Sequence, residues 1–224
     1  MLSCIPTSHE TLRATNDYGA ALVSAHPDRF GLLAALPTDD PTACLVEIER
    51  TVSSYAIPPD GFALSTCYNN QPLADPRLDP VWAALDVRGA VVHIHLTTTI
   101  APAGGALPAL AGRLELLGAE SWVDNPQGVT REEITRQLGG LHVDTAASAR
   151  TGIPAAAVMC GPEKCVYGSD CGVPCSTEET MRTNQADLAV IERRLGLKEN
   201  SFGRHGWKLF PNASKRAGIA WATE

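Results

Sequence analysis

Several features are scarce in this chain of 224 residues, and each shortage argues against a class of protein. Aromatic residues make up only 5% of the sequence, and the 18 Lys and Arg residues form no cluster among 25 Asp and Glu residues. With a net charge of −7 and few stacking side chains, nucleic acid is not an expected partner. No run of about 18 apolar residues is present, so we expect no membrane-spanning helix.

The N-terminal segment and the cysteines indicate the cellular compartment. Met1–Pro6 has neither a basic segment nor a long apolar one, so we expect no secretory signal and predict a cytoplasmic protein. The seven cysteines are odd in number and show no pair of CxxC motifs, which argues against a structural zinc site. We expect reduced thiols at all seven positions, which are Cys4, Cys44, Cys67, Cys160, Cys165, Cys171 and Cys175.

The composition favours a folded protein, with 44% apolar and 19% charged residues, and the length suits one domain over residues 1–224. Short apolar runs rich in β-formers alternate with longer runs of helical period, a pattern typical of α/β proteins with a mostly parallel sheet. The predicted strands are Leu2–Pro6, Phe30–Leu36, Gly61–Thr66, Ala90–His95, Leu141–Thr145 and Cys165–Ser169.

The predicted helices lie between and after these strands. Asp40 is an expected N-cap with Pro41 at the first helical position, and Ser176 or Thr177 is an expected N-cap of the last helix. The helices are Thr11–Ala25, Pro41–Tyr55, Asp79–Arg88, Leu107–Leu117, Thr130–Leu138, Pro154–Cys160 and Thr177–Leu195. We expect loops over Thr97–Gly105 and Ala119–Gly128.

The repeated strand and helix order predicts a TIM-type (β/α)₈ barrel that is incomplete. A closed barrel needs eight strand–helix units, because a missing strand leaves backbone groups of its neighbours unpaired. About six units are visible in this sequence.

The predicted strand ending in Val92-His93-Ile94-His95 carries the first candidate site. Alternation along a strand puts His93 and His95 on one face, where two imidazoles can bind one metal ion, and catalytic groups of parallel barrels gather at this end of the strands. The alternative is one packed histidine beside one exposed histidine.

The second candidate is Asp170, which follows the apolar segment Val166-Tyr167-Gly168-Ser169. A carboxylate at the end of a strand can bind a metal ion or act as a base, whereas the alternative is a cap for the following turn.

Weaker signals lie elsewhere. His142 and Asp144 alternate on one predicted strand and either face the barrel interior or make structural hydrogen bonds. Gly104-Gly105 before a helix suits an anion site or, more commonly, a simple turn. The remaining histidines, His9, His26 and His205, are expected to face solvent.

An ordered set of motifs resembles the decarboxylase-like branch of the metal-dependent amidohydrolase superfamily, which includes aminocarboxymuconate-semialdehyde, γ-resorcylate and 6-methylsalicylate decarboxylases. The motifs are weak singly, but their shared order covers most of the chain. They are Asn16-Asp17, His26–Phe30, Ala34–Pro37, Asp60-Gly61, Leu73–Trp82, Val91–His93, Gly104–Pro108, Gly112-Arg113, Val143–Ala146, Gly161-Pro162, Tyr167–Asp170 and Leu209–Ala213.

The resemblance implies a divalent metal ion, commonly zinc and sometimes manganese, and a small carboxylic acid as substrate. His93 matches the family ligand on the fifth barrel strand, and Asp170 matches the catalytic ligand on the eighth. His95 is a candidate substitute ligand where the family requires none. The resemblance also implies a homodimer as a candidate assembly.

Two family features are missing from the sequence. The first-strand His-x-His pair is absent, because the chain opens at what matches the second strand. The sixth-strand histidine is also absent, because Thr97 passes almost directly to Gly104-Gly105. A catalytic metal generally needs about three protein ligands, so His93 and Asp170 alone are too few.

Three functions are therefore considered. The leading hypothesis is a metal-dependent decarboxylase of a small aromatic or unsaturated carboxylic acid. The second is a metal-dependent hydrolase of a lactone or amide from the same superfamily. The third is a truncated, catalytically inactive paralogue or the product of a faulty gene prediction.

Overall fold

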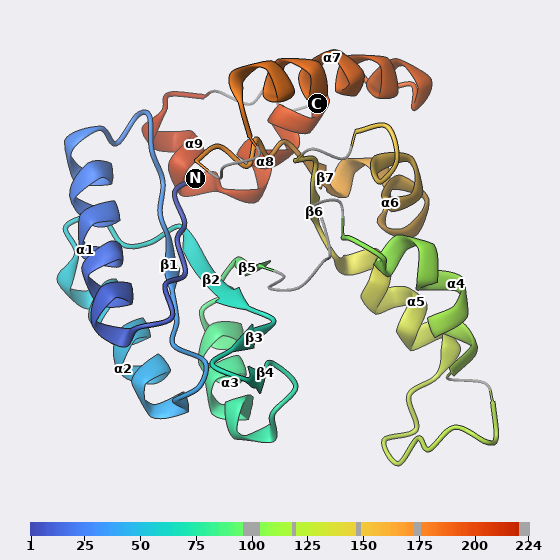
Figure 1. Ribbon diagram of the computed structural model, residues 1–224, viewed down its shortest axis with the longest axis horizontal. Helices are drawn as coiled ribbons and strands as arrows, with labels where there is room; N and C mark the ends of the chain where they lie inside the picture. Colours follow the sequence, from blue (N-terminus) through green and yellow to red (C-terminus); the bar gives the residue numbers. More distant parts are fainter. Residues whose placement is uncertain (96–103, 118–119, 147–148, 173–175, 220–224) are drawn as a thin grey trace. The chain divides into compact units, whose positions relative to one another are not determined.

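The computed structural model of the chain describes residues 1–95, 104–117, 120–146, 149–172 and 176–219 (Figure 1). The chain divides into two compact units, Met1–Thr99 with Trp207–Glu224, and Ile100–Gly206. Each unit has a hydrophobic core of its own. A single domain over 1–224 stays a prediction, and the loops predicted at 97–105 and 119–128 lie partly outside the described residues.

The first unit is built on a parallel sheet in the order β1-β2-β5. The strands are β1 (Leu33–Ala35), β2 (Gly61–Ser65) and β5 (Val92–His95). Every residue of β1 and β2 is buried, as expected for parallel strands whose two faces are both covered. The expected central strands of this unit are therefore confirmed, although each is shorter than the apolar run that predicted it.

Three helices pack on one face of this sheet: α1 (His9–Ala25), α2 (Pro41–Ser54) and α3 (Asp79–Val87). The Asp40 carboxylate caps α2 by accepting hydrogen bonds from the backbone of Thr42 and Ala43, both at 3.0 Å. Pro41 follows at the first helical position, where its missing N–H costs nothing. The predicted cap is confirmed, and the start of α2 is where the sequence placed it.

The sequence did not reveal a short hairpin and two C-terminal helices. Strands β3 (Cys67–Tyr68) and β4 (Gln71–Pro72) pair across a turn in which Asn69 and Asn70 have positive φ of 47° and 64°. A single turn of 3₁₀ helix, η1 (Pro76–Leu78), precedes α3. The helices α8 (Ser201–Leu209) and α9 (Pro211–Arg216) close the described chain.

Helix α9 is fixed to the first unit by an ion pair. The guanidinium of Arg216 lies 2.7 Å from the carboxylate of Asp60, whose side chain is 2% exposed. Asp60 also accepts a hydrogen bond from the backbone N–H of Leu32, at 3.2 Å. The C-terminal segment is therefore tied to the amino ends of β1 and β2.

The second unit contains helices α4 (Leu107–Leu117), α5 (Arg131–Gly140), α6 (Ile153–Cys160) and α7 (Glu178–Arg194). Its two strands, β6 (Val143–Asp144) and β7 (Cys165–Val166), are parallel, and the 3₁₀ turn η2 (Pro162–Lys164) precedes β7. The core of this unit is formed by β6, α6, β7, α7 and the start of α8, through the buried apolar residues Val143, Ala149, Ile153, Ala156, Ala157, Cys160, Cys165, Leu188, Ile191 and Phe202.

The predicted strand at Leu2–Pro6 is wrong in extent. Only Leu2 makes a parallel bridge, with Leu32, and the segment after it forms no strand. Pro6 has no backbone N–H to donate, and the place of a partner beside Ala35 is taken by a side chain of α1. Among the described residues the strands form separate sheets, none of them closed.

That side chain is Asn16, which pairs with the backbone of β1 as a neighbouring strand would. Its amide nitrogen donates to the carbonyl of Ala35 at 3.0 Å, and its oxygen accepts from the N–H of Ala35 at 2.8 Å. The same nitrogen donates to Glu47 at 2.8 Å. Asn16 is 2% exposed, so it satisfies buried backbone groups that water does not reach.

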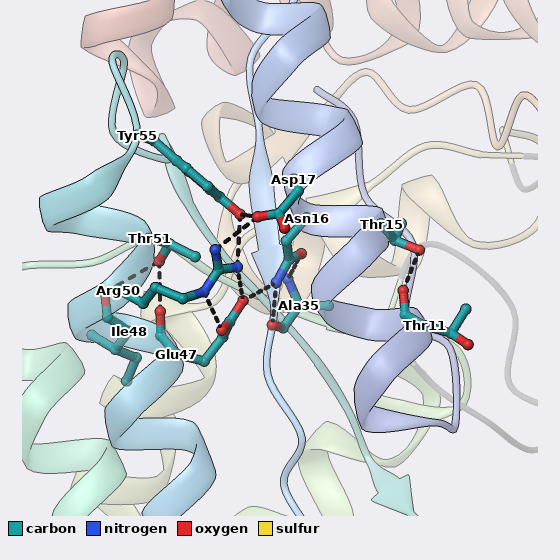
Figure 2. A network of polar contacts seen from close by, with 10 residues as sticks. All are labelled: Thr11, Thr15, Asn16, Asp17, Ala35, Glu47, Ile48, Arg50, Thr51 and Tyr55. Atoms are coloured by element: carbon teal, nitrogen blue, oxygen red, sulfur yellow. Dashed lines mark hydrogen bonds and ion pairs between the residues drawn. The ribbon is translucent and has the colours of Figure 1, made fainter.

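Figure 2 shows how this contact continues into a polar network between α1 and α2. Arg50 binds the Glu47 carboxylate through two nitrogens, at 2.7 and 2.8 Å, and contacts Asp17 at 2.7 Å. Tyr55 donates to Asp17 at 2.7 Å. Partial burial raises the pKa of Asp17, but hydrogen bonds from Tyr55 and Arg50 outweigh it, so the pKa is lowered and the carboxylate stays charged.

A buried carboxylate organises the second unit in a comparable way. Glu192 on α7 is 4% exposed and accepts backbone hydrogen bonds from Asn200 at 2.9 Å and from Phe202 at 3.0 Å. These N–H groups belong to the start of α8, where backbone donors have no partner within the helix. A negative charge is also favoured at this end of a helix.

Within the described part of the chain, no helix combines the length and apolar character needed to cross a membrane.

We predict that Asn16→Ala lowers the free energy of unfolding by about 2 to 4 kcal/mol, because each buried polar group left unpaired costs about 1 to 3 kcal/mol. Urea unfolding followed by circular dichroism measures the change. Thr15→Ala is the matched control, since the Thr15 hydroxyl donates only to Thr11 of the same helix, at 2.8 Å. It should change stability by less than about 0.5 kcal/mol, and equal losses would contradict the pairing role.

We also predict that Glu192→Gln speeds hydrogen exchange at one of the two backbone amides that Glu192 binds, Asn200 or Phe202. The amide side chain keeps one acceptor oxygen but replaces the other with a donor, so one backbone N–H loses its partner. Amide exchange followed by NMR or mass spectrometry reports it. Glu179→Gln, an exposed residue in the first turn of α7, should leave exchange at α8 unchanged.

Candidate functional site

Strand β5 carries both histidines of the His-x-His pattern, and the strand register fixes their face. The partners of His93 and His95 on β2 are Ala63 and Ser65. Phe62 and Leu64, which alternate with these partners, point into the core beneath the helices. His93 and His95 therefore share the face opposite the helices, as the alternation predicted. Their role as metal ligands stays a prediction.

The spacing of the two rings is wider than a shared metal ion requires. A zinc–nitrogen bond of about 2.0 to 2.1 Å puts the ion about 3 Å from a ring centroid, so tetrahedral geometry separates two centroids by about 5 Å. The centroids of His93 and His95 are 6.5 Å apart. His95 is exposed and His93 is half-buried, an arrangement that also fits the alternative of one packed histidine beside one exposed histidine.

A second polar group, which no sequence motif indicated, lies at the same carboxyl edge of the sheet. Asp39 follows β1, and its carboxylate lies 2.7 Å from His9 Nε2 and accepts from the side chain of Asn69 at 2.8 Å. Partial burial raises the pKa of Asp39, but the hydrogen bonds from Asn69 and His9 outweigh it and lower the pKa. These three residues are about 30 positions apart in sequence, so only the fold brings them together.

Asp170 lies in the second unit, beyond the end of β7. The segment leading to it is held by hydrogen bonds from Tyr167 to the carbonyl of Phe202, at 3.0 Å, and from Gly168 to the hydroxyl of Thr145, at 3.2 Å. Asp170 is exposed and has a φ of 55°, a conformation that aspartate tolerates better than most residues.

The turn after Asp170 is held by a different side chain. The Ser169 hydroxyl accepts from the backbone N–H of Cys171, at 3.3 Å. The alternative of Asp170 as a cap for the turn stays a prediction, because residues 173–175 lie outside the described residues. The role of Asp170 as a metal ligand or base stays a prediction as well.

His142 and Asp144 are only partly on one strand, because β6 begins at Val143. Burial and the charge of Lys164 lower the pKa of His142. The Asp144 carboxylate accepts from the backbone N–H of Ala146 at 2.9 Å, and a side chain at Gly168 would meet it at 3.2 Å. Asp144 therefore makes the structural hydrogen bond that was its alternative role.

The remaining sequence signals have local explanations. Gly104 and Gly105 both have positive φ and form a turn, in which the carbonyl of Gly104 accepts from Leu107 at 3.0 Å. His205 does not simply face solvent as expected, because its Nδ1 lies 3.0 Å from the carbonyl of Cys165 and its ring lies edge-on to Phe202.

The described residues do not by themselves fit a catalytic metal ion. Within the described ranges, no three His, Cys, Asp or Glu side chains lie together in an arrangement that could hold one. The β5 face supplies two imidazoles, whereas a catalytic site generally has three protein ligands and an open position. His93 and Asp170 belong to the two different units.

Comparison with known proteins places the chain in a family. The sequence profile described as "Amidohydrolase" matches residues 6–203. The chain is 38% identical over 88 residues to the 6-methylsalicylic acid decarboxylase of Penicillium expansum. That match covers 38% of this chain and 26% of the relative, so it spans about a quarter of the length of that decarboxylase.

Solved structures show the same fold at lower identity. The 2,6-dihydroxybenzoate decarboxylase from Rhizobium is 18% identical with a TM-score of 0.72, over 91% of this chain and 77% of that chain. The dihydroxybenzoic acid decarboxylase of Polaromonas sp. JS666, with bound manganese and an inhibitor, is 17% identical with a TM-score of 0.69, over 96% and 76%.

These likenesses confirm the predicted class, an α/β barrel fold represented here without a closed sheet among the described residues. They also confirm the resemblance first drawn from the ordered motifs. With a family profile matched over residues 6–203, the chain belongs to the amidohydrolase family.

Proposed function

We propose that this protein is a carboxy-lyase that removes CO₂ from a small aromatic or unsaturated carboxylic acid with the help of a divalent metal ion. The proposal is supported by the similarity to decarboxylases of 6-methylsalicylic and dihydroxybenzoic acids. One of these relatives contains manganese, so manganese and zinc are both candidates.

The observation that carries the proposal is the position of the candidate residues at the carboxyl ends of parallel strands. In the first unit His95 ends β5, and β5 is parallel to β2. In the second unit Asp170 follows β7, and β7 is parallel to β6. Active sites of α/β barrels and open α/β sheets gather at this edge. In each unit, considered by itself, the candidate residues therefore lie where active-site residues of such proteins are found.

We propose His93 and His95 of the first unit and Asp170 of the second unit as metal-binding residues. His95 is proposed in place of a ligand that the family carries elsewhere. Imidazole nitrogens and carboxylate oxygens are donors that suit zinc and manganese.

A hydrolase is the second candidate, because the same family resemblance covers metal-dependent hydrolysis. The two reactions differ in what they consume and release. A hydrolase consumes water and releases no CO₂, whereas a carboxy-lyase replaces the carboxyl group with a proton.

We predict that the 224-residue protein, loaded with Mn²⁺ or Zn²⁺, releases CO₂ from 6-methylsalicylate or 2,6-dihydroxybenzoate. Membrane-inlet mass spectrometry of CO₂ and chromatography of the acid should show equal amounts formed and lost. A chelator should abolish the release, and fresh metal should restore it.

Lactones and amides are tested in parallel. Turnover of these without CO₂ would replace the carboxy-lyase by a hydrolase. No turnover of either class, together with no metal by elemental analysis, would support the inactive paralogue.

We predict that His93→Ala, His95→Ala and Asp170→Asn each weaken Mn²⁺ binding by at least about tenfold, since even the loss of a residue that only orients a ligand commonly costs that much. Equilibrium dialysis measures binding without any assay of activity. His26→Gln is the control, because His26 lies at the end of α1 and its ring contacts Phe30. Unchanged binding in Asp170→Asn would remove Asp170 from the ligand set.

A further inference from the structure

Two cysteines of the second unit are brought together by a tight turn. Cys160 is the last residue of α6, and Cys165 is the first residue of β7. Between them Gly161 has a φ of 91°, where a side chain would also collide with the carboxylate of Glu163. Only glycine fits this position without strain. The turn at Gly161 brings Cys165 back beside Cys160.

Both thiols lie inside the core beside one carbonyl group. Their Sγ atoms lie 3.8 and 3.9 Å from the same acceptor, the carbonyl oxygen of Gly161. The Cys160 thiol also donates to the carbonyl of Ala156, at 3.2 Å. Cys160 is 5% exposed and Cys165 is fully buried. Their neighbours in the core are apolar residues of α6, α7 and α8.

We propose that Cys160 and Cys165 are an oxidative modification site, a dithiol that a low-molecular-mass disulfide such as oxidised glutathione converts to an internal disulfide. Because both sulfur atoms lie within 4 Å of the same carbonyl oxygen, closing the bond between them requires a movement of the short turn that contains Gly161. The proposal is independent of the carboxy-lyase function.

The reaction proceeds in two exchanges. The Cys160 thiolate attacks one sulfur of oxidised glutathione, forming a mixed disulfide and releasing one glutathione thiolate. The Cys165 thiolate then attacks the Cys160 sulfur, closes the protein disulfide and releases the second glutathione. Two protein thiols are oxidised, one glutathione disulfide is reduced, and the two protons pass to the released thiolates.

The environment of each thiol determines which of the two attacks the glutathione disulfide first. The hydrogen bond from Cys165 lowers the pKa of Cys160, against the opposing effect of burial. The same contact, with burial, raises the pKa of Cys165. Cys160 is therefore the attacking thiol, since the thiolate is the reactive form. By contrast, burial raises the pKa of Cys44, in the core of the first unit, to about 12.

Oxidation would tie the end of α6 to the start of β7. Cys165 pairs with Val143 of β6, and the chain after β7 continues through Gly168 to Asp170. The disulfide would thus restrain the strand that leads to the candidate ligand. Its formation is measurable whether or not Asp170 binds a metal ion.

The test uses the full chain with only this pair of thiols retained. Cys4, Cys67, Cys171 and Cys175 are changed to Ser and Cys44 to Ala, and circular dichroism checks the fold. After incubation with oxidised glutathione, the number of thiols titrated in urea should fall from two to none, with a mass loss of two hydrogens. Dithiothreitol should restore both thiols. Two retained thiols, or two glutathione adducts, would overturn the proposal.

Two controls distinguish a disulfide that the folded structure favours from one that forms only because the two cysteines are close in sequence. Adding Cys165→Ala should leave Cys160 with a glutathione adduct that persists. The glutathione ratio at half oxidation should also differ at least about tenfold between folded and urea-unfolded protein, in favour of the folded disulfide. Equal ratios would reject a preorganised pair.

The unaltered protein gives a direct check that needs no substitutions. Trypsin cuts after Lys164, between the two cysteines, so an internal disulfide joins two separate peptides. The second peptide runs to Arg182 and also contains Cys171 and Cys175. Fragmentation of the linked peptides from the oxidised, alkylated protein should therefore place the bond between Cys160 and Cys165. Alkylation of Cys160, or a link from Cys160 to Cys171 or Cys175, would contradict the proposal.

Discussion

The pairing of the backbone at the outer edge of β1 is the constraint on which the first unit depends. Buried N–H and C=O groups must find partners, and the segment before α1 leaves the sheet after Leu2. Asn16 supplies both missing bonds to Ala35, and this fixes the height of α1 against the sheet. Two residues of α2 then hold it to α1: Glu47 accepts from the same amide, and Arg50 donates to Asp17. The carboxyl edge that carries His95 and Asp39 is positioned by this arrangement.

The sequence predicted the elements whose signals are local. Asp40 and Pro41 mark the start of α2 because capping and the first helical position act within four residues. Leu107–Leu117 was predicted with its observed bounds because its apolar residues follow the helical period. The parallel strands were predicted from buried apolar runs, but they are shorter than those runs because hydrogen bonding to a neighbour, rather than hydrophobicity, ends a strand.

The elements that the sequence did not reveal depend on distant partners. Helix α8 contains Gly203 and Gly206, which weaken helical propensity, and its N-terminal donors are bound by Glu192 of α7. The β3–β4 hairpin includes Pro72 and two asparagines, a composition that indicates a loop. The ion pair that holds α9 joins residues 156 positions apart. No window of sequence contains such information.

In the candidate site too, local sequence signals predicted some residues and missed those that depend on distant partners. A period of two was enough to place His93 and His95 on one face, because alternation is a property of any strand. It was not enough to find Asp39, His9 and Asn69, which meet only when β1, α1 and the β3–β4 turn are assembled. Two imidazoles alone hold a catalytic metal ion weakly against water. The presence of a third ligand therefore distinguishes an enzyme from an inactive relative. In the second unit, Asp170 is exposed beyond the end of a parallel strand. Among the described residues, the backbone N–H of Cys171 in the turn that follows is bound by the Ser169 hydroxyl and not by the Asp170 carboxylate. Whether Asp170 binds a metal ion stays a prediction, because the fold of each unit alone supplies fewer than three ligands.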